Sequence, residues 1–363
     1  MSGPLRHVRP ALADIPRYVP GRAAAPAAGP TYTLSSNENP YPPVPAVARA
    51  AESALGSGNR YPDLAATALV AAIAASVGVP PDRVVVGTGS VGVLGQVLQA
   101  TCEPGDEVVT AWRSFEAYPI ATRVVGARPV QVPLTADGRH DLAAMARAVT
   151  DRTRLVLVCT PNNPTGPAVH EREVLDLLAA VGGRCPVVLD EAYAEFVRDP
   201  GAVVGTALAA SRDDVVVLRT FSKAHGLASL RVGYGVAGPA LADAMRATAV
   251  PFGVSGAAQA AALAALTARD EIAAQVEAIV AERARVVAGL LAAGWRIPDA
   301  QGNFVWLPVG GVTADLVAAF ADRGVSVRGF PDEGVRVSIG EPAANDVVLD
   351  VLRDPRWAGV RGA

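Results

Sequence analysis

Short apolar runs and amphipathic segments alternate through the middle of the chain. The runs lie at Val84–Gly87, about Glu107–Thr110, near Pro129–Val132, and at Leu155–Cys159, Val187–Leu189, Val215–Leu218 and Val232–Val236. Such runs, separated by helical segments, are typical of a mostly parallel sheet that helices cover on both faces. The pattern therefore predicts an α/β fold, with ligand sites beyond the carboxyl ends of the strands.

The pattern changes on both sides of this region. Residues 1 to about 31 are rich in Pro, Gly and Ala, which predicts an extended arm that another surface must order. After Pro239 we expect helices at Ser255–Leu266 and about Arg269–Ala293, and then a smaller α/β unit with strands at Phe304–Leu307, Val325–Arg328 and Val335–Ile339. Since 363 residues exceed one ordinary core, we expect an arm at 1–43, a large domain at 44–250, and linker helices with a small domain at 251–363.

Three of the apolar runs end in loops that carry reactive or polar side chains. The first leads into Thr160–Gly166, the second into Asp190–Tyr193, and the third into the stretch around Lys223. Any one of these loops could be ordinary turn chemistry. Because the carboxyl ends of parallel strands meet at one edge of a sheet, the three together predict a single site.

Gly87–Gly92 matches the G-x-G-x-x-G pattern of dinucleotide-binding turns. That pattern expects an acidic residue at the end of the second strand, but here the strand runs into Ala111-Trp112-Arg113. We therefore retain only a phosphate site, formed by backbone N–H groups at the start of the following helix.

Lys223 is the only lysine in the chain. A lysine with a lowered pKa can form a Schiff base with a carbonyl, whereas arginine stays protonated. Loss of all other lysines by chance is the alternative reading of this composition. The neighbours favour a site, because Thr220, Ser222 and Arg231 bring two hydroxyls and a guanidinium that can hold a phosphate.

Two arginines, Arg328 and Arg336, are expected on neighbouring strands of the small unit. An arginine within an apolar strand indicates an anion partner. For Arg328 that partner could be a protein carboxylate or a ligand, and for Arg336 a ligand is the better interpretation.

Composition narrows the class of protein. Half of the residues are apolar and the formal net charge is −3, which favours a globular protein without a nucleic-acid-binding tract. Cys102, Cys159 and Cys185 lack metal-ligand spacing, and their odd count argues against a disulfide framework. The N-terminus lacks the apolar run of a signal peptide, and no membrane span is expected. We predict a cytoplasmic protein that binds no metal.

A phosphate site, an aspartate at a strand end, an asparagine, a tyrosine and one reactive lysine together describe a pocket for pyridoxal phosphate. The motifs Pro161-Asn-Asn-Pro-Thr-Gly166, Asp190-Glu-Ala-Tyr193, Ser222-Lys223 with Arg231, and Gly334-Val-Arg-Val-Ser-Ile-Gly340 resemble fold-type I aminotransferases of the histidinol-phosphate and aromatic amino acid branch. The resemblance runs from Arg17 to Gly340 and implies a PLP-dependent transferase fold, with a mostly parallel sheet in the large domain.

The resemblance also implies roles for individual residues. Lys223 would bind the cofactor and move the proton, Asp190 would pair with the pyridine nitrogen, and Asn163 and Tyr193 would bond the phenolic oxygen. Ser90, Val91, Thr220, Ser222 and Arg231 would hold the phosphate, Phe115 would stack on the ring, and Tyr61 would enter from the neighbouring subunit of a homodimer with shared active sites. The residues expected to face the substrate are Arg336, Arg328, Tyr18, Asn39 and Tyr41.

The stretches Trp112–Pro119, Val250–Phe252 and Asn303–Pro308 look more like the aromatic branch. We therefore expect transfer of an amino group between aromatic amino acids and 2-oxo acids such as 2-oxoglutarate. Histidinol-phosphate transamination is the alternative, because one arginine accepts either a carboxylate or a phosphate. A decarboxylase of the same fold, a regulatory module without turnover and a nicotinamide dehydrogenase are the further alternatives.

Overall fold

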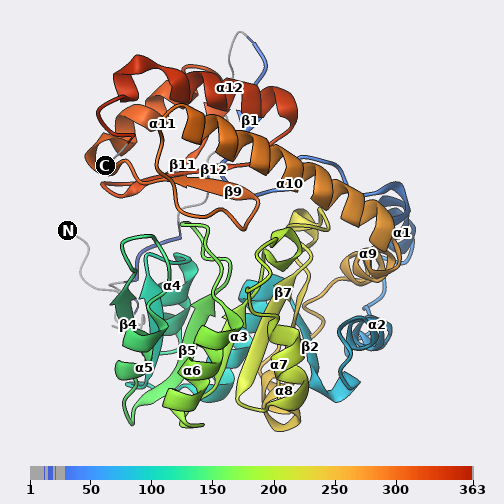
Figure 1. The fold of residues 1–363 in the computed structure, drawn as a ribbon. Helices are drawn as coiled ribbons and strands as arrows, with labels where there is room; N and C mark the ends of the chain where they lie inside the picture. The colour runs from blue at the N-terminus through green and yellow to red at the C-terminus, as the bar shows by residue number, and fades with distance from the viewer. Residues whose placement is uncertain (1–11, 13–14, 19–20, 22–28, 362–363) are drawn as a thin grey trace, which may run out of the picture.

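The structure, a computed structural model, describes residues 12, 15–18, 21 and 29–361. Its main feature is a seven-stranded sheet with the order β2-β8-β7-β6-β5-β3-β4 (Figure 1). The strands are β2 (Val84–Gly87), β3 (Glu107–Trp112), β4 (Arg128–Pro133), β5 (Thr153–Cys159), β6 (Val187–Asp190), β7 (Val215–Thr220) and β8 (Gly233–Val236). The expected mostly parallel sheet is confirmed, and β8 is the exception because it runs antiparallel to both neighbours.

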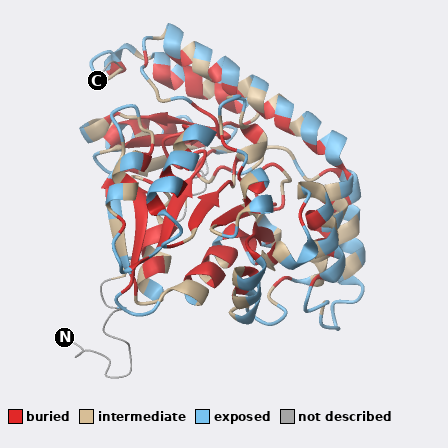
Figure 2. Cartoon of the chain, turned by 60° about the horizontal axis from the view of Figure 1, so that its bottom comes forward, coloured by how far each residue is buried: buried red, intermediate tan, exposed pale blue. Residues whose placement is uncertain are grey.

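Strand β7 illustrates why these runs are apolar throughout. Val215 and Val217 join one core cluster, whereas Val216 and Leu218 join a second cluster on the other face. The helices that enclose the sheet are α3 (Gly89–Thr101), α4 (Ala117–Val124) and α8 (Pro239–Ala247) on the second face, and α5 (Leu142–Arg147), α6 (Glu171–Val181) and α7 (Gly205–Ser211) on the first. Since successive side chains of a strand alternate between faces, a sheet covered on both faces favours apolar residues at consecutive strand positions. Figure 2 shows most of the strands as buried, whereas the edge strand β4 is largely exposed or half-buried.

A smaller three-stranded antiparallel sheet has the order β11-β12-β9. It consists of β9 (Phe304–Leu307), β11 (Arg328–Phe330) and β12 (Gly334–Ser338), and it packs with α11 (Thr313–Ala321) and α12 (Pro342–Arg353). The single strand expected at Val325–Arg328 is wrong. The chain forms β10 (Val325–Ser326), which pairs in parallel with β1 (Tyr32–Thr33), and only then enters β11. We call the part built on the seven-stranded sheet the large lobe and the part built on this sheet the small lobe.

Helix α10 (Arg269–Ala292) connects the lobes (Figure 1), since it contacts α12 and β9 in the small lobe and the short helical turn Ala194–Phe196 in the large lobe. Helix α9 (Gly256–Thr267) precedes it and packs against α1 (Pro45–Leu55) and α2 (Thr67–Val77). Helix α9, which follows the expected domain boundary at residue 251, therefore packs against helices α1 and α2, which precede it.

The expected N-terminal arm lies largely outside the described residues. Its described end contributes β1, and the neighbouring Leu34 donates its backbone N–H to Ser326 at 2.8 Å. This end of the arm therefore lies against the small lobe. Among the described residues, no helix is long and apolar enough to cross a membrane.

Candidate active site

A cavity of about 250 Å³ lies where the carboxyl ends of β5, β6 and β7 face the small sheet. Most of the residues that the sequence predicts for the site line it: Tyr18, Ser90, Val91, Phe115, Asn163, Asp190, Tyr193, Thr220, Ser222, Lys223, Arg231, Arg328 and Arg336. The convergence expected from three loop sequences is therefore present in the structure. Concave sites with few convergent polar groups are typical of small-molecule binding.

Asp190 ends β6 at the floor of this cavity. Its Oδ2 accepts a hydrogen bond from the Tyr118 hydroxyl at 2.8 Å, but its Oδ1 is buried and has no hydrogen-bond partner in the part of the chain that the structure describes. Burial raises the pKa of Asp190 to about 6, although the Tyr118 hydrogen bond acts in the opposite direction. A buried carboxylate oxygen without a partner is costly. Its position fits a ligand that presents a protonated ring nitrogen.

Lys223 follows β7 and points its Nζ into the same space. Nζ donates to the Ser36 carbonyl oxygen at 2.9 Å and lies 5.9 Å from the centre of the Tyr193 ring. Burial, and then the nearby charges of Arg336 and Arg231, lower the pKa of Lys223 to about 7. A large fraction of this amine is therefore neutral at neutral pH, as a nucleophile or proton acceptor must be.

The anion-binding end of the cavity combines a helix start with hydroxyls and a guanidinium. Ser90 lies in the first turn of α3, and Ser222 Oγ accepts from Arg231 Nη1 at 3.3 Å and lies 3.0 Å from Thr220 Oγ1. A side chain at Gly89 would meet Arg231 Nη2 at 2.7 Å, and the φ of Gly89 is +77°. Only glycine therefore allows the guanidinium to lie against the helix start. Backbone N–H groups at a helix start with an adjacent arginine form a site for a phosphate group.

Asn163 and Tyr193 lie between this floor and the small lobe. Asn163 Oδ1 accepts from Arg336 Nη1 at 2.5 Å, and the Tyr193 hydroxyl accepts from Asn37 Nδ2 at 3.0 Å. Burial raises the pKa of Tyr193 above its usual range. Both side chains thus reach the cavity as neutral hydrogen-bonding groups.

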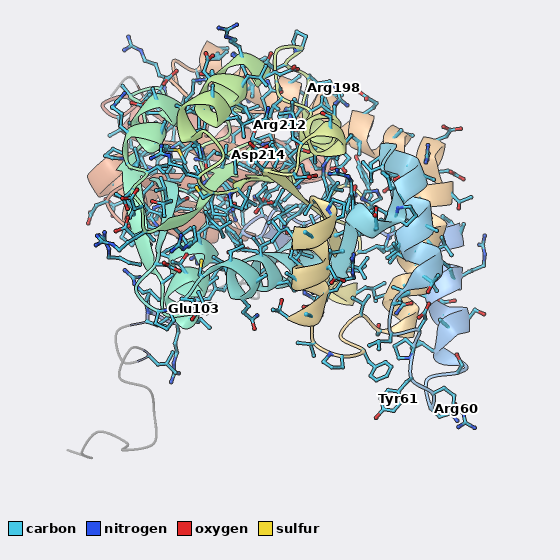
Figure 3. All side chains as sticks on the ribbon, turned by 90° about the horizontal axis from the view of Figure 1, so that it is seen from below. Arg60, Tyr61, Glu103, Arg198, Arg212 and Asp214 are labelled. Atoms are coloured by element: carbon cyan, nitrogen blue, oxygen red, sulfur yellow. The ribbon has the colours of Figure 1, made fainter. Side chains whose placement is uncertain are left out.

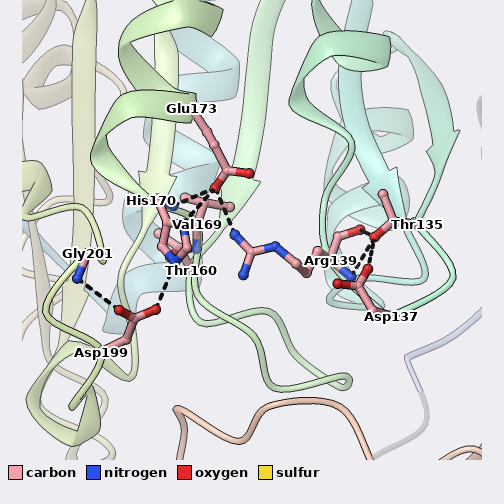
Figure 4. A network of polar contacts seen from close by, with 9 residues as sticks. All are labelled: Thr135, Asp137, Arg139, Thr160, Val169, His170, Glu173, Asp199 and Gly201. Carbon is pink, nitrogen blue, oxygen red and sulfur yellow. Dashed lines mark hydrogen bonds and ion pairs between the residues drawn. The ribbon is translucent and has the colours of Figure 1, made fainter.

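A network of polar contacts stabilises the loop that carries Asn163 (Figure 4). Thr160 Oγ1 accepts from the Val169 backbone N–H at 3.1 Å, and His170 Nε2 lies 2.8 Å from Asp199 Oδ2. Glu173 accepts from the His170 backbone N–H at 2.8 Å, and the loop is therefore tied to the first turn of α6.

Arg336 is buried without a carboxylate partner among the described residues. Its Nη2 donates to the Ser35 carbonyl oxygen at 2.6 Å, and its Nε has no partner. Burial lowers the pKa of Arg336. A buried guanidinium with only neutral acceptors is poised to bind an anion.

Arg328 lies opposite Arg336 in the register of β11 and β12, but its environment differs. Its Nη2 forms an ion pair with Glu116 Oε2 at 2.7 Å, and its guanidinium lies 5.5 Å from the centre of the Phe330 ring. Tyr18 and Phe115 are in edge-to-face contact nearby, with ring centres 6.3 Å apart. This end of the cavity is aromatic and its cation is already neutralised.

The structure does not bring Asn39, Tyr41 and Tyr61 into the cavity. Asn39 Nδ2 donates to the Ala224 carbonyl oxygen at 3.1 Å, and Asn39 and Tyr41 line a neighbouring hollow. Tyr61 is 82% exposed, stacks on Phe252 at a rim of the molecule (Figure 3) and does not line the cavity. Within a single chain, these three residues therefore do not line the cavity.

Sequence reasoning missed several residues that line the cavity or hydrogen-bond to its lining residues. Tyr118 and Glu116 belong to the stretch Trp112–Pro119, whose aromatic character indicates the substrate class but not these two contacts. Ser35 and Ser36 contribute backbone carbonyl oxygens, which any residue could supply. For Tyr118 a signal existed, because it lies three residues after the predicted ring-stacking residue Phe115.

The comparisons with known proteins agree with this geometry. The family model described as aminotransferase class I and II matches residues 31–352. The chain is 56% identical to the aromatic amino acid aminotransferase of Streptomyces avermitilis, over 97% of this chain and 98% of that protein. It is 54% identical to the protein of the same name from Streptomyces coelicolor, over 98% of this chain and 99% of that protein.

Among solved structures, the chain is similar to the histidinol-phosphate aminotransferase of Sinorhizobium meliloti in complex with pyridoxal-5'-phosphate. The TM-score is 0.86 at 28% identity, over 97% of this chain and 99% of that chain. A Thermus thermophilus aspartate aminotransferase mutant gives a TM-score of 0.78 at 26% identity, over 90% and 91% of the two chains. From its fold, its cavity and these relatives, the chain belongs to the class I and II aminotransferases.

Proposed function

We propose that this chain is a pyridoxal phosphate-dependent transaminase that moves an amino group between aromatic amino acids and 2-oxo acids such as 2-oxoglutarate. The observation that carries the cofactor assignment is the unpartnered Oδ1 of Asp190, buried in the same cavity as the amine of Lys223. This cavity also contains the anion site formed by α3, Ser222 and Arg231. The three features match the ring nitrogen, the aldehyde and the phosphate of one molecule.

Different residues of the chain would bind the cofactor, transfer protons and bind the substrate. Pyridoxal phosphate, when bound, supplies an aldehyde that takes up the amino group and a ring that accepts electrons from the substrate α-carbon. Asp190 would hold the proton on the ring nitrogen, and Asn163 and Tyr193 would hydrogen-bond the phenolic oxygen. Lys223 would accept the proton from the α-carbon and return it, because its lowered pKa leaves a base at neutral pH. Arg336 would bind the carboxylate of the substrate.

The aromatic end of the cavity supports an aromatic side chain. Phe115, Phe330 and Tyr18 line this end, and Glu116 neutralises its cation Arg328. The dianionic phosphate of histidinol phosphate would need further unpaired donors there. The two Streptomyces relatives named for aromatic amino acids support the same choice.

The test is a panel of amino donors with the purified, cofactor-loaded protein. We expect phenylalanine and tyrosine to transfer their amino group to 2-oxoglutarate with a higher kcat/KM than histidinol phosphate, and the visible absorbance of the bound cofactor to change when a donor is added. A protein without visible absorbance and without turnover would contradict the cofactor assignment. A preference for histidinol phosphate would contradict the substrate assignment alone.

The proposal includes a homodimer with shared active sites. Exposed apolar side chains gather at one rim, where Tyr61 stacks on Phe252 and Val250 is 73% exposed, and contiguous apolar surface favours a protein partner. Tyr61 of a second copy would complete the phosphate site. Mixing the inactive Lys223→Arg variant with a Tyr61→Ala variant should then restore turnover, since each mixed dimer regains one intact site. Failure to exceed the summed activities of the two variants would contradict a shared site.

A further inference from the structure

Transamination of aromatic substrates with 2-oxoglutarate, on which this inference rests, imposes a requirement on the side-chain end of the cavity. An aromatic side chain is uncharged, whereas glutamate and 2-oxoglutarate carry a second carboxylate. Both must bind the same cavity in alternate half-reactions. A fixed, unpaired cation would favour the acidic substrate, and a purely apolar wall would reject it.

The Glu116–Arg328 ion pair lies at this end and joins the two lobes. Glu116 directly precedes α4 in the large lobe, and Arg328 begins β11 in the small lobe. Both line the cavity beside Phe115 and Phe330. The Arg328 side chain is 14% exposed and the Glu116 side chain is 30% exposed. The guanidinium is therefore enclosed, while its carboxylate partner lies at the edge, where it can reach water.

The chemistry of this pair allows exchange of one carboxylate for another. The planar guanidinium presents several N–H donors in fixed directions that match any carboxylate. When an aromatic side chain is bound, Glu116 keeps Arg328 paired, and no buried charge is left alone. When a substrate with a distal carboxylate is bound, that carboxylate can take the position of Glu116, which turns toward solvent. The number of carboxylates on Arg328 stays the same in both states.

We propose that Glu116 is a specificity-determining residue, whose carboxylate occupies Arg328 while an uncharged side chain is bound and yields to the distal carboxylate of the acidic co-substrate. Glu116 thus competes with glutamate and 2-oxoglutarate and sets the balance between the two half-reactions.

A second ion pair on the same two segments provides the control. Arg113 Nε donates to Glu333 Oε2 at 2.8 Å, so that Arg113 pairs with the turn after β11, and neither residue lines the cavity. In this second pair the arginine belongs to the large lobe and the glutamate to the small lobe, the reverse of the Glu116–Arg328 pair. Loss of either glutamate removes one ion pair between the lobes, but only Glu116 faces the substrate.

The experiment compares Glu116→Gln and Glu333→Gln with the wild type, using kcat/KM for phenylalanine and for glutamate. Glutamine keeps the size of glutamate and removes its charge. In Glu116→Gln we expect kcat/KM for glutamate to rise by roughly tenfold relative to that for phenylalanine, since a competing charge-assisted pair is lost. In Glu333→Gln the ratio should stay at the wild-type value.

Equilibrium binding of unreactive analogues provides a second readout. Calorimetry should show tighter binding of glutarate, a dicarboxylate, to Glu116→Gln than to the wild type, and unchanged binding of 3-phenylpropionate. An unchanged ratio in Glu116→Gln, or an equal shift in Glu333→Gln, would overturn the proposal. A wild-type enzyme without activity on phenylalanine would instead contradict the proposed function.

Discussion

The two walls of the cavity differ in how their charged groups are paired. On the large-lobe wall, and counting the described residues, Asp190 keeps a buried oxygen without a partner and Lys223 donates to a neutral carbonyl oxygen. On the small-lobe wall, Arg328 already has a carboxylate partner, and that partner comes from the opposite lobe. Arg336, in register with Arg328, resembles the large-lobe wall because its acceptors are neutral.

This difference separates two tasks. Groups with unsatisfied bonding capacity are strained until a ligand completes them, which suits a cofactor that stays bound. A cation whose carboxylate partner is partly exposed can exchange that partner at small cost, which suits substrates that alternate. The chain thus places its unpaired groups where every bound state presents the same group, either the cofactor or the carboxylate common to the substrates, and its paired group where the side chain of the substrate changes.

The largest expected effect tests the large-lobe wall. Lys223→Arg should abolish transamination without unfolding the protein, because arginine has a similar length but stays protonated and cannot act as nucleophile or base. Turnover and circular dichroism measure the two parts of the expectation. Borohydride reduction of the wild type should attach the cofactor to the Lys223 peptide, and detectable turnover of the arginine variant would refute the assignment.

Asp190→Asn should stabilise the cofactor-free protein and destabilise the cofactor-loaded protein. In the cofactor-free protein at pH 7, the variant should be more stable by up to about 3 kcal/mol, since the carboxylate with a pKa of about 6 is held ionised in a buried site. The native state binds this proton more tightly than the unfolded chain, and the wild type therefore loses stability as pH rises from about 4 to about 6. The advantage of the variant should disappear below that window.

Denaturant unfolding at several pH values measures this difference. In the cofactor-loaded protein the wild type should be the more stable of the two, because the neutral amide of the variant cannot hold the ring proton. Proton transfer from the amino donor should also be slower in the variant. Equal stability of the two cofactor-free proteins at pH 7 would show that the carboxylate is not under strain.

Arg336→Ala should weaken the binding of every substrate, because all of them present an α-carboxylate or another anion to this guanidinium. The loss of a charge-assisted hydrogen bond predicts a fall in kcat/KM of at least about tenfold for phenylalanine and for glutamate. Steady-state kinetics with both donors measures it. A selective loss for one donor would mean that Arg336 contacts a side chain instead.

The smallest effect is expected on the small-lobe wall. Arg328→Ala should reduce kcat/KM for glutamate and histidinol phosphate but should change that for phenylalanine by less than about threefold, since an aromatic ring makes no charge-assisted bond there. A matched comparison is Arg336→Ala in the same assay. If histidinol phosphate is the best donor of the wild type and is selectively lost in this variant, the aromatic assignment is wrong.

Local sequence was enough for the residues of the large-lobe wall that follow its central strands. These residues follow the strands β5, β6 and β7 within a few positions, and the parallel arrangement brings strand ends together. Asp190, Lys223 and Asn163 could be named because each belongs to a motif at such an end. The cavity contains all three.

The small-lobe wall depended on tertiary structure. Glu116 and Arg328 are 212 positions apart, and neither sequence context indicates the other. The division of Val325–Arg328 into β10 and β11 follows from pairing with β1, a segment near the other end of the chain. Asn39 and Tyr41 belong to a polar segment beside the site, but the local turn directs them into the neighbouring hollow.

The sequence by itself determined the fold class, the strand ends and the chemistry of the floor, because hydrophobic periodicity and motifs act over a few residues. Tertiary structure alone decided which carboxylate meets which guanidinium, which oxygen of Asp190 is left without a partner and where Tyr118 donates. The physical reason is that these properties depend on the packing of segments far apart in the chain, and pairing and burial are properties of the packed molecule.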